Sequence, residues 1–185
     1  MPPLTPSQTV GPFFAILVPG RGRLRLCADG ASGVPIRVEG TVRDGKGAAL
    51  GDALVEIWQA DAAGRYHHPD DPRAGPPNAS FTGFGRIHTD AAGGFAVETI
   101  KPGRVPGSGG LQAPHLVVGL FARGLLARLV TRIYFDDEPS NAGDPILALV
   151  PADRRSTLIA ASRGDGLYHF DIALQGPDET VFFHV

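Results

Sequence analysis

The sequence of 185 residues predicts an all-β fold: a single β-sandwich with an extended N-terminal arm and at most one short helix. Its 25 glycines and 17 prolines separate short apolar stretches and form no low-complexity tract. Many of these stretches alternate apolar with polar residues and are rich in β-branched side chains, as half-buried strands are. The hydrophobic content of 43% suffices for one substantial core, so we expect one globular domain.

Seven segments carry this strand pattern. Most are bounded by turn residues, and DGKG at 44–47 and DAAGG at 90–94 are typical of tight turns because Gly and Asp tolerate positive φ. Short strands joined by turns indicate a sandwich or a barrel. The expected strands comprise residues 36–42, 53–60, 94–100, 115–122, 127–135, 167–174 and 180–185.

One helix and one arm complete the predicted architecture. The segment PADRRSTLIAA at 151–161 is the helical candidate, since proline stands near its start and apolar residues follow toward its end. Residues 1–33 show no clear periodicity, and we expect an extended arm that contacts a partner chain, followed by the sandwich at 34–185. The arm contains Pro2, Pro3, Pro6, Pro12 and Pro19.

The charge pattern narrows the function classes. The net charge is −2, and 17 basic and 19 acidic residues are spread along the chain without a block typical of nucleic-acid or membrane binding. We therefore expect small molecules or proteins as partners. The single cysteine, Cys27, excludes an intrachain disulfide framework, so a cytoplasmic enzyme or enzyme subunit fits best. The proline-broken N-terminus has no basic region typical of a signal peptide.

The segment APHLVVGLFARG at 113–124 contains a histidine in an unusual setting. Metal-binding strands often use His-x-His, because residues i and i+2 point to the same face. Here His115 is followed two positions later by Val117, which cannot ligate a metal. The strand either has no connection with a metal or belongs to a protein that lost one.

Long ordered segments cover nearly the whole chain. They are TPSQTVGPFF at 5–14 and the segments 40–66, 83–103, 113–124, 131–151 and 168–183. Together they resemble the intradiol ring-cleaving dioxygenases. The resemblance implies a β-sandwich of the type found in that family. It also implies an oxidoreductase of aromatic catabolism that uses O2 to cleave a catechol ring between its two hydroxyl-bearing carbons.

The resemblance also implies a metal. Catalytic chains of the family hold Fe(III) with two tyrosines and two histidines, and phenolates are hard anionic donors suited to this ion. The four ligand positions correspond here to Tyr66, Val105, His115 and Val117, so valine replaces two ligands. The resemblance therefore implies that this chain binds no metal, that Fe(III) lies on a homologous partner chain, and that the two form a higher-order hetero-oligomer.

Two surviving ligand positions leave one alternative open. Tyr66 and His115, helped by His67, His68 or His88, could form an unusual iron site in a dioxygenase that works alone. Two ligands without a preorganised second pair give weak sites, however. The simpler interpretation is a buried neutral histidine at 115, a tyrosine packed at a sheet edge, and a solvated loop.

The resemblance implies that the N-terminal TxGPF motif at 9–13 and the arginine of FARG line the substrate pocket that this chain shares with its partner. Phe13 offers an apolar face to an aromatic ring, and a guanidinium suits a carboxylated catechol because it presents paired donors. The residues concerned are Thr9, Gly11, Pro12, Phe13 and Arg123.

Two further possibilities concern these residues. Arg123 could instead form a structural salt bridge with an acidic neighbour, such as Asp136, Asp137 or Glu138. The chain could also be a scaffold that takes no part in catalysis. Arg128 and Arg132, in the following strand, are expected to be structural.

Overall fold

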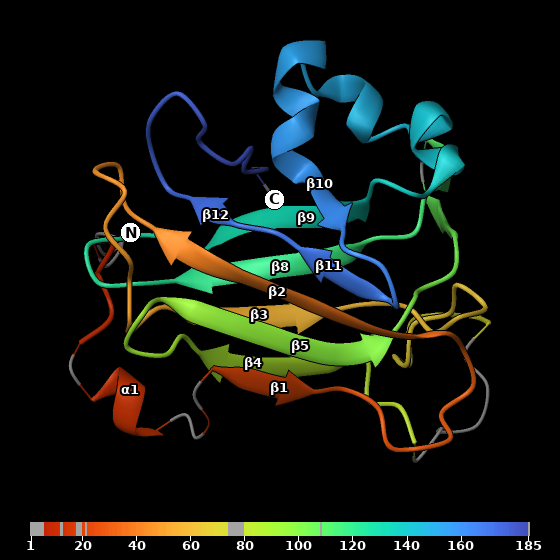
Figure 1. Cartoon of the computed structure of the whole chain (residues 1–185), viewed down its shortest axis with the longest axis horizontal. Coiled ribbons are helices and arrows are strands. Elements are labelled where there is room, and N and C mark those ends of the chain that lie inside the picture. Colours follow the sequence, from red (N-terminus) through yellow and green to blue (C-terminus); the bar gives the residue numbers. More distant parts are fainter. Residues whose placement is uncertain are drawn as a thin grey trace, which may run out of the picture.

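The computed structural model of the chain describes residues 6–11, 13–17, 20, 22–73, 80–107 and 109–184. It consists mainly of β-strands (Figure 1), which confirms the fold class. The strands are β1 (Arg23–Arg25), β2 (Pro35–Arg43), β3 (Leu54–Trp58), β4 (Phe84–His88), β5 (Gly94–Ile100), β6 (Val105–Gly107), β7 (Gly110–Gln112), β8 (Leu116–Phe121), β9 (Leu129–Phe135), β10 (Ile159–Ser162), β11 (Leu167–His169) and β12 (Ile172–Ala173).

The strands of one large sheet fold around a common core. Their order is β1-β5-β2-β11-β10-β9-β8-β3-β4, with β12 paired to β2, while β6 and β7 form a separate hairpin. The sheet nearly closes, because the amide of Thr82, just before β4, donates to the carbonyl of Leu26 beside β1 at 2.9 Å. Figure 1 shows β2 and β5 in front of β3 and β8. The layers enclose buried side chains such as Val38, Val55, Val97 and Val118.

Most expected strands are present, and the differences have local causes. The segment expected at 167–174 forms two short strands, β11 and β12, which both pair with β2. Between them the carbonyl of Phe170 lies so close to Gly40 that a Cβ there would be 1.8 Å from its oxygen. The chain stays against β2 between the two strands, since the amide of Phe170 also donates to the carbonyl of Glu39 at 2.9 Å. The expectation of a strand at 180–185 is wrong for residues 180–184, because Phe183 makes only an isolated bridge to Val130.

The helical segments differ from the expectation at 151–161. In this region a 3₁₀-helix, η3, covers Ala152–Leu158, and the chain then continues as β10 because Ile159 pairs with Tyr134 of β9. Two more 3₁₀-helices precede it, η1 (Pro139–Gly143) and η2 (Leu147–Leu149). A short α-helix, α1 (Phe14–Leu17), lies in the segment expected to be extended. None of the helices in the described ranges is long and apolar enough to cross a membrane.

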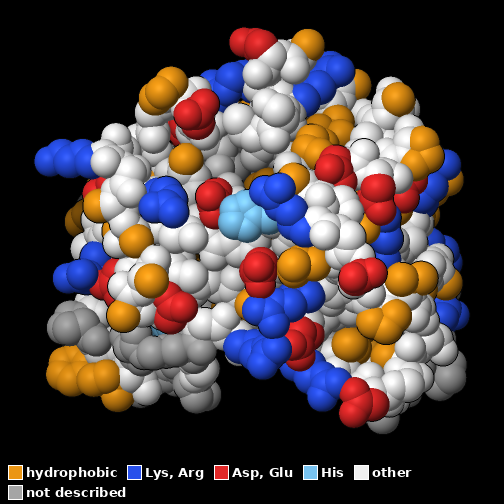
Figure 2. Space-filling model, viewed as in Figure 1, with side chains coloured by type: hydrophobic (Ala, Val, Ile, Leu, Met, Phe, Trp, Pro, Cys, Tyr) orange, Lys and Arg blue, Asp and Glu red, His pale blue; other side chains and the backbone are white. Residues whose placement is uncertain are grey.

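Acidic and basic side chains are interspersed on the face of the sheet shown in Figure 2. Arg37 of β2 pairs with Glu39 at 2.9 Å, and Arg23 of β1 pairs with Glu98 of β5 at 2.5 Å. This arrangement matches the mixed charge pattern of the sequence.

Candidate functional site

Thr9 of the N-terminal segment lies against the turn that follows β8. Its hydroxyl oxygen accepts a hydrogen bond from the amide of Gly124 at 2.7 Å and is 3.4 Å from the carbonyl of Ala122, to which it donates. A single side chain therefore joins two segments more than a hundred residues apart. The structure brings Thr9 and Arg123, two of the sequence-predicted pocket residues, to the same corner of the molecule.

Arg123 forms an ion pair with Asp52, which ends the turn before β3. Its side chain nevertheless remains 74% exposed, so much of the guanidinium faces solvent. The salt bridge to an acidic residue that the sequence left open is therefore present, but its partner is Asp52 and not one of the acidic residues 136–138. Asp137 instead pairs with Lys101 at 2.8 Å, on the part of the chain that follows β5.

The remaining N-terminal residues present an exposed apolar surface. Phe13 is 72% exposed, and a Cβ placed on Gly11 would meet no atom within 4 Å. Phe14 anchors this segment, because its ring packs against Phe121 at 6.1 Å and against His88 at 5.5 Å between centroids. Pro12 lies outside the described residues. The exposed positions are thus available to a molecule outside this chain.

Beside this corner, the N-terminal segment and the turn after β8 enclose a groove of about 420 Å³. Its wall includes the apolar side chains of Val10, Leu125 and Leu126, and Leu126 is 60% exposed. The turn after β8 thus carries both exposed apolar side chains and the Arg123 guanidinium.

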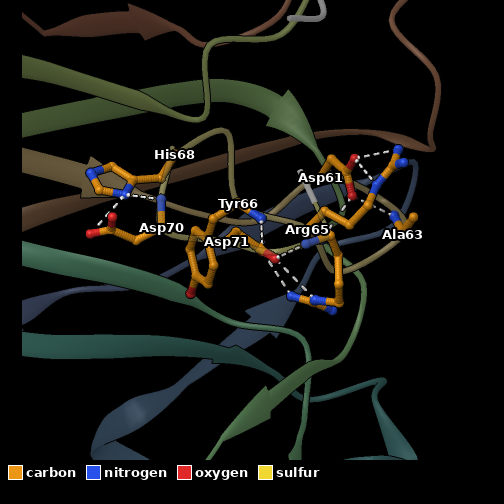
Figure 3. A network of polar contacts seen from close by, with 8 residues as sticks. Asp61, Ala63, Arg65, Tyr66, His68, Asp70 and Asp71 are labelled. Atoms are coloured by element: carbon orange, nitrogen blue, oxygen red, sulfur yellow. Dashed lines mark hydrogen bonds and ion pairs between the residues drawn. The ribbon is translucent and has the colours of Figure 1, made fainter. Parts of the chain in front are cut away.

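A second cluster contains the positions that the family resemblance predicts as counterparts of iron ligands. Tyr66 follows a loop in which the carboxylate of Asp61 accepts from the amides of Ala63 at 2.8 Å and Arg65 at 3.0 Å (Figure 3). The Tyr66 amide donates to Asp71 at 2.8 Å. The Tyr66 ring packs on Trp58 with 4.6 Å between the ring centroids, and burial raises the pKa of the Tyr66 phenol.

The loop that carries Tyr66 is held against the segment before Val105. The carbonyl of Asp61 accepts from the amide of Gly103 at 2.9 Å. Gly64 has a φ of +75°, and a Cβ there would lie 1.9 Å from the carbonyl oxygen of Arg104. This contact requires glycine, and it brings the Tyr66 loop next to the β6–β7 hairpin.

His115 is 2% exposed and adjoins the start of β8. Its Nδ1 lies 2.7 Å from the carbonyl oxygen of Ala113 and must donate its hydrogen to that acceptor. Burial lowers the pKa of His115 to about 4, with a further contribution from the positive charge of Arg132. The imidazole is therefore neutral at pH 7, as expected for a buried histidine in this position.

The residues present do not fit a four-ligand iron site. Val105 is 6% exposed and pairs with Gln112 in the β6–β7 hairpin, while Val117 is half-buried in β8. Neither side chain has an electron pair to offer. His67 and His68 lie exposed in the loop after Tyr66. In the described ranges, no three His, Cys, Asp or Glu side chains come close enough together to hold a metal.

His88, the remaining helper considered from the sequence, is fully buried at the end of β4. It packs against Phe14, and neither ring nitrogen has a hydrogen-bond partner among the described residues. It supports the N-terminal segment by packing.

Known proteins are similar to this chain over most of its length. A family model described as Dioxygenase matches residues 10–176. The chain is 45% identical to the protocatechuate 3,4-dioxygenase alpha chain of Burkholderia cepacia, over 98% of this chain and 97% of the other. It is 40% identical to the beta chain from that organism, over 80% of this chain and 67% of the other.

A solved structure has the same fold. It is the dioxygenase domain of a dioxygenase carbohydrate-binding protein fusion from Streptomyces sp. SirexAA-E, with a TM-score of 0.63 and 28% identity. The similarity covers 92% of this chain and 99% of the other.

Proposed function

Because this chain belongs to the intradiol dioxygenase family, we propose that it is the alpha subunit of a protocatechuate 3,4-dioxygenase. The family is iron-dependent, and in this proposal the Fe(III) is bound by a homologous beta subunit. The complex cleaves protocatechuate with O2 to 3-carboxy-cis,cis-muconate, in the beta-ketoadipate pathway. This chain contributes a wall of the shared active site.

The presence of valine at positions 105 and 117 is the observation that carries the proposal. Val105 and Val117 stand at two of the four ligand positions, so the chain cannot supply the donor set that Fe(III) requires. Similarity over nearly the full length to an alpha chain supports the same assignment. A chain that keeps the fold but binds no iron can contribute residues to the active site of another chain.

The corner formed by Thr9 and Arg123 is the proposed contact with that site. Phe13 and the backbone of Gly11 are exposed there, and they offer apolar contact and close approach to an aromatic ring. Arg123 keeps exposed donors beside its ion pair, and these suit the carboxylate of protocatechuate. Pro12 is included in the proposal as part of the same segment.

Assembly and location follow from the same proposal. The exposed apolar residues Phe13, Ile16 and Leu126 would be covered by the beta subunit, and alpha–beta pairs would associate into a higher-order oligomer. We expect the complex in the cytoplasm, since Cys27 is the only cysteine of the chain and gives it no disulfide of its own.

Coexpression with an iron-bearing beta subunit tests the proposal. Arg123→Ala should reduce kcat/KM for protocatechuate about tenfold or more, since hydrogen bonds to charged groups contribute about 1.5–3 kcal/mol. The effect should be smaller for catechol, which has no carboxylate. Arg163→Ala, at an exposed arginine between β10 and β11, is the matched control and should leave both substrates unaffected.

Two results would contradict the proposal. Unchanged kinetics for variants at Arg123, Thr9 and Phe13 would make the chain a scaffold only. Stoichiometric iron in the chain purified alone, with a visible tyrosinate-to-iron absorption band, would instead make it an independent iron dioxygenase.

A further inference from the structure

We infer that the guanidinium of Arg132 lies where the four former ligand positions converge, and that this fixed cation, in addition to the two missing ligands, excludes a metal from this chain. The inference concerns this chain alone and does not depend on the proposed partner.

The sheet register places Arg132 beside one replaced ligand. Val117 of β8 pairs directly with Arg132 of β9 on one side and with Trp58 of β3 on the other. Directly opposite residues of antiparallel strands project to the same face with about 5 Å between their Cβ atoms. His115 precedes Val117 by two positions, and its ring lies 5.6 Å from that of Tyr134, two positions after Arg132. All of these side chains therefore share one face.

The hairpin that carries the other replaced ligand also holds Arg132. Val105 pairs with Gln112 across the β6–β7 hairpin. The side-chain oxygen of Gln112 accepts a hydrogen bond from Nη1 of Arg132 at 2.8 Å, and the Tyr134 hydroxyl accepts from the same nitrogen at 3.2 Å. These two bonds fix the guanidinium between the hairpin and β9.

The two retained ligand positions, Tyr66 and His115, also lie near Arg132. The His115 ring lies 5.6 Å from the ring of Tyr134, whose hydroxyl accepts a hydrogen bond from Arg132 at 3.2 Å. Tyr66 packs on Trp58, which flanks Val117. The geometry thus surrounds Arg132 with all four positions.

A buried carboxylate balances the cation. Asp144 is 1% exposed, and its Oδ1 accepts from the Tyr134 hydroxyl at 3.2 Å, which places it one hydrogen bond away from Arg132. A guanidinium stays protonated, has no lone pair and would repel Fe(III) at short range. Restoring the missing donors alone would therefore create a site that already contains a positive charge.

Iron binding by reconstructed sites tests this inference. The full chain is prepared as Val105→Tyr/Val117→His and as the triple variant that also carries Arg132→Gln. Each is incubated anaerobically with Fe(II), oxidised in air and desalted, and its iron content and visible absorption are measured. We expect the triple variant to retain about one iron per chain with a tyrosinate band, and its affinity to exceed that of the double variant by at least about a hundredfold, or roughly 2.7 kcal/mol.

Matched variants keep the test decisive. Arg128→Gln replaces Arg132→Gln in a control triple variant, because Arg128 pairs with Glu56 at 3.3 Å and makes the same change of charge. This control should bind no more iron than the double variant. Arg132→Met, which keeps the side-chain length, gives the same comparison if Arg132→Gln does not fold by circular dichroism. Equal iron affinity in the double variant and a folded triple variant would overturn the inference.

Discussion

Asp52 and Arg123 form an ion pair two residues beyond the last paired residues of β3 and β8. Leu54 pairs with Phe121 in this ladder, and the same antiparallel register continued by two residues places Asp52 opposite Arg123. The acidic partner of the arginine is therefore determined by the register of two strands that are distant in sequence. One edge of the guanidinium is held by the carboxylate, and its other donors remain free to meet a ligand.

We predict that Asp52→Asn raises KM for protocatechuate in the alpha–beta complex about fivefold with little change in kcat. This corresponds to a loss of about 1 kcal/mol of substrate-binding free energy when Arg123 is no longer oriented by the ion pair. Asp52→Glu should restore most of the affinity. The thermal stability should change little, because Arg123 is 74% exposed in this pair. An unchanged KM in Asp52→Asn would show that the ion pair does not orient the arginine.

Thr9 is predicted to act through its hydroxyl. Thr9→Val removes the acceptor for the Gly124 amide, a bond of 2.7 Å, and should lower kcat/KM about fivefold, since one such bond contributes about 1 kcal/mol. Thr9→Ser keeps the hydroxyl and serves as the control. Steady-state kinetics at constant iron content distinguish the two. An unchanged kcat/KM in Thr9→Val, or a loss in Thr9→Ser as large as that in Thr9→Val, would contradict a role of the hydroxyl alone.

Asp144 is predicted to be a major determinant of stability. Its carboxylate accepts from the amides of Ala113 at 2.7 Å and Leu147 at 2.8 Å, and from the Tyr134 hydroxyl. Asp144→Ala leaves these buried donors unpaired and should lower the free energy of unfolding by about 3 kcal/mol. Urea denaturation measures the change, and exposed Asp153→Ala should stay within about 0.5 kcal/mol of the wild type.

His115 should make stability depend on pH. Its pKa falls from 6.5 to about 4 on folding, so between these values the unfolded chain binds a proton that the native chain does not. Stability from this group is fully present above pH 6.5 and declines as the pH falls toward 4, by up to about 3 kcal/mol.

Denaturation at several pH values measures this contribution. His115→Gln should remove it and flatten the difference curve between pH 6.5 and 4. The control Leu149→Gln, at an exposed residue without a titratable group, should keep the slope of the wild type. An unaltered slope in His115→Gln would mean that other groups account for the pH dependence.

The sequence pattern was most reliable for strands with strong alternation. The alternating segment expected at 36–42 is β2 (Pro35–Arg43), in which every second residue is buried. The strand expected at 94–100 also has these bounds in the structure. Short strands such as β1, β4 and β10 were missed, because they are held by pairing with distant segments and carry little pattern of their own. Residues 159–161 look helical in sequence, yet in the structure their backbone pairs with β9 on one side and β11 on the other.

The candidate site divides in the same way. Motif resemblance pointed to Thr9 and Arg123, and the structure joins their segments through one hydroxyl. Nothing in the sequence indicated that Asp52 pairs with Arg123, and only a structural role was predicted for Arg132. Both depend on strand register, which brings together residues that no local spacing relates.

Residue type and order alone establish the all-β class and the similarity to intradiol dioxygenases, and they predict the loss of two ligands. Which polar side chains meet follows from the three-dimensional fold: Asp52 pairs with Arg123, and Arg132 donates to Gln112 and Tyr134. These contacts arise when nonadjacent strands align, and the free energy that selects the alignment comes from burial of the whole core.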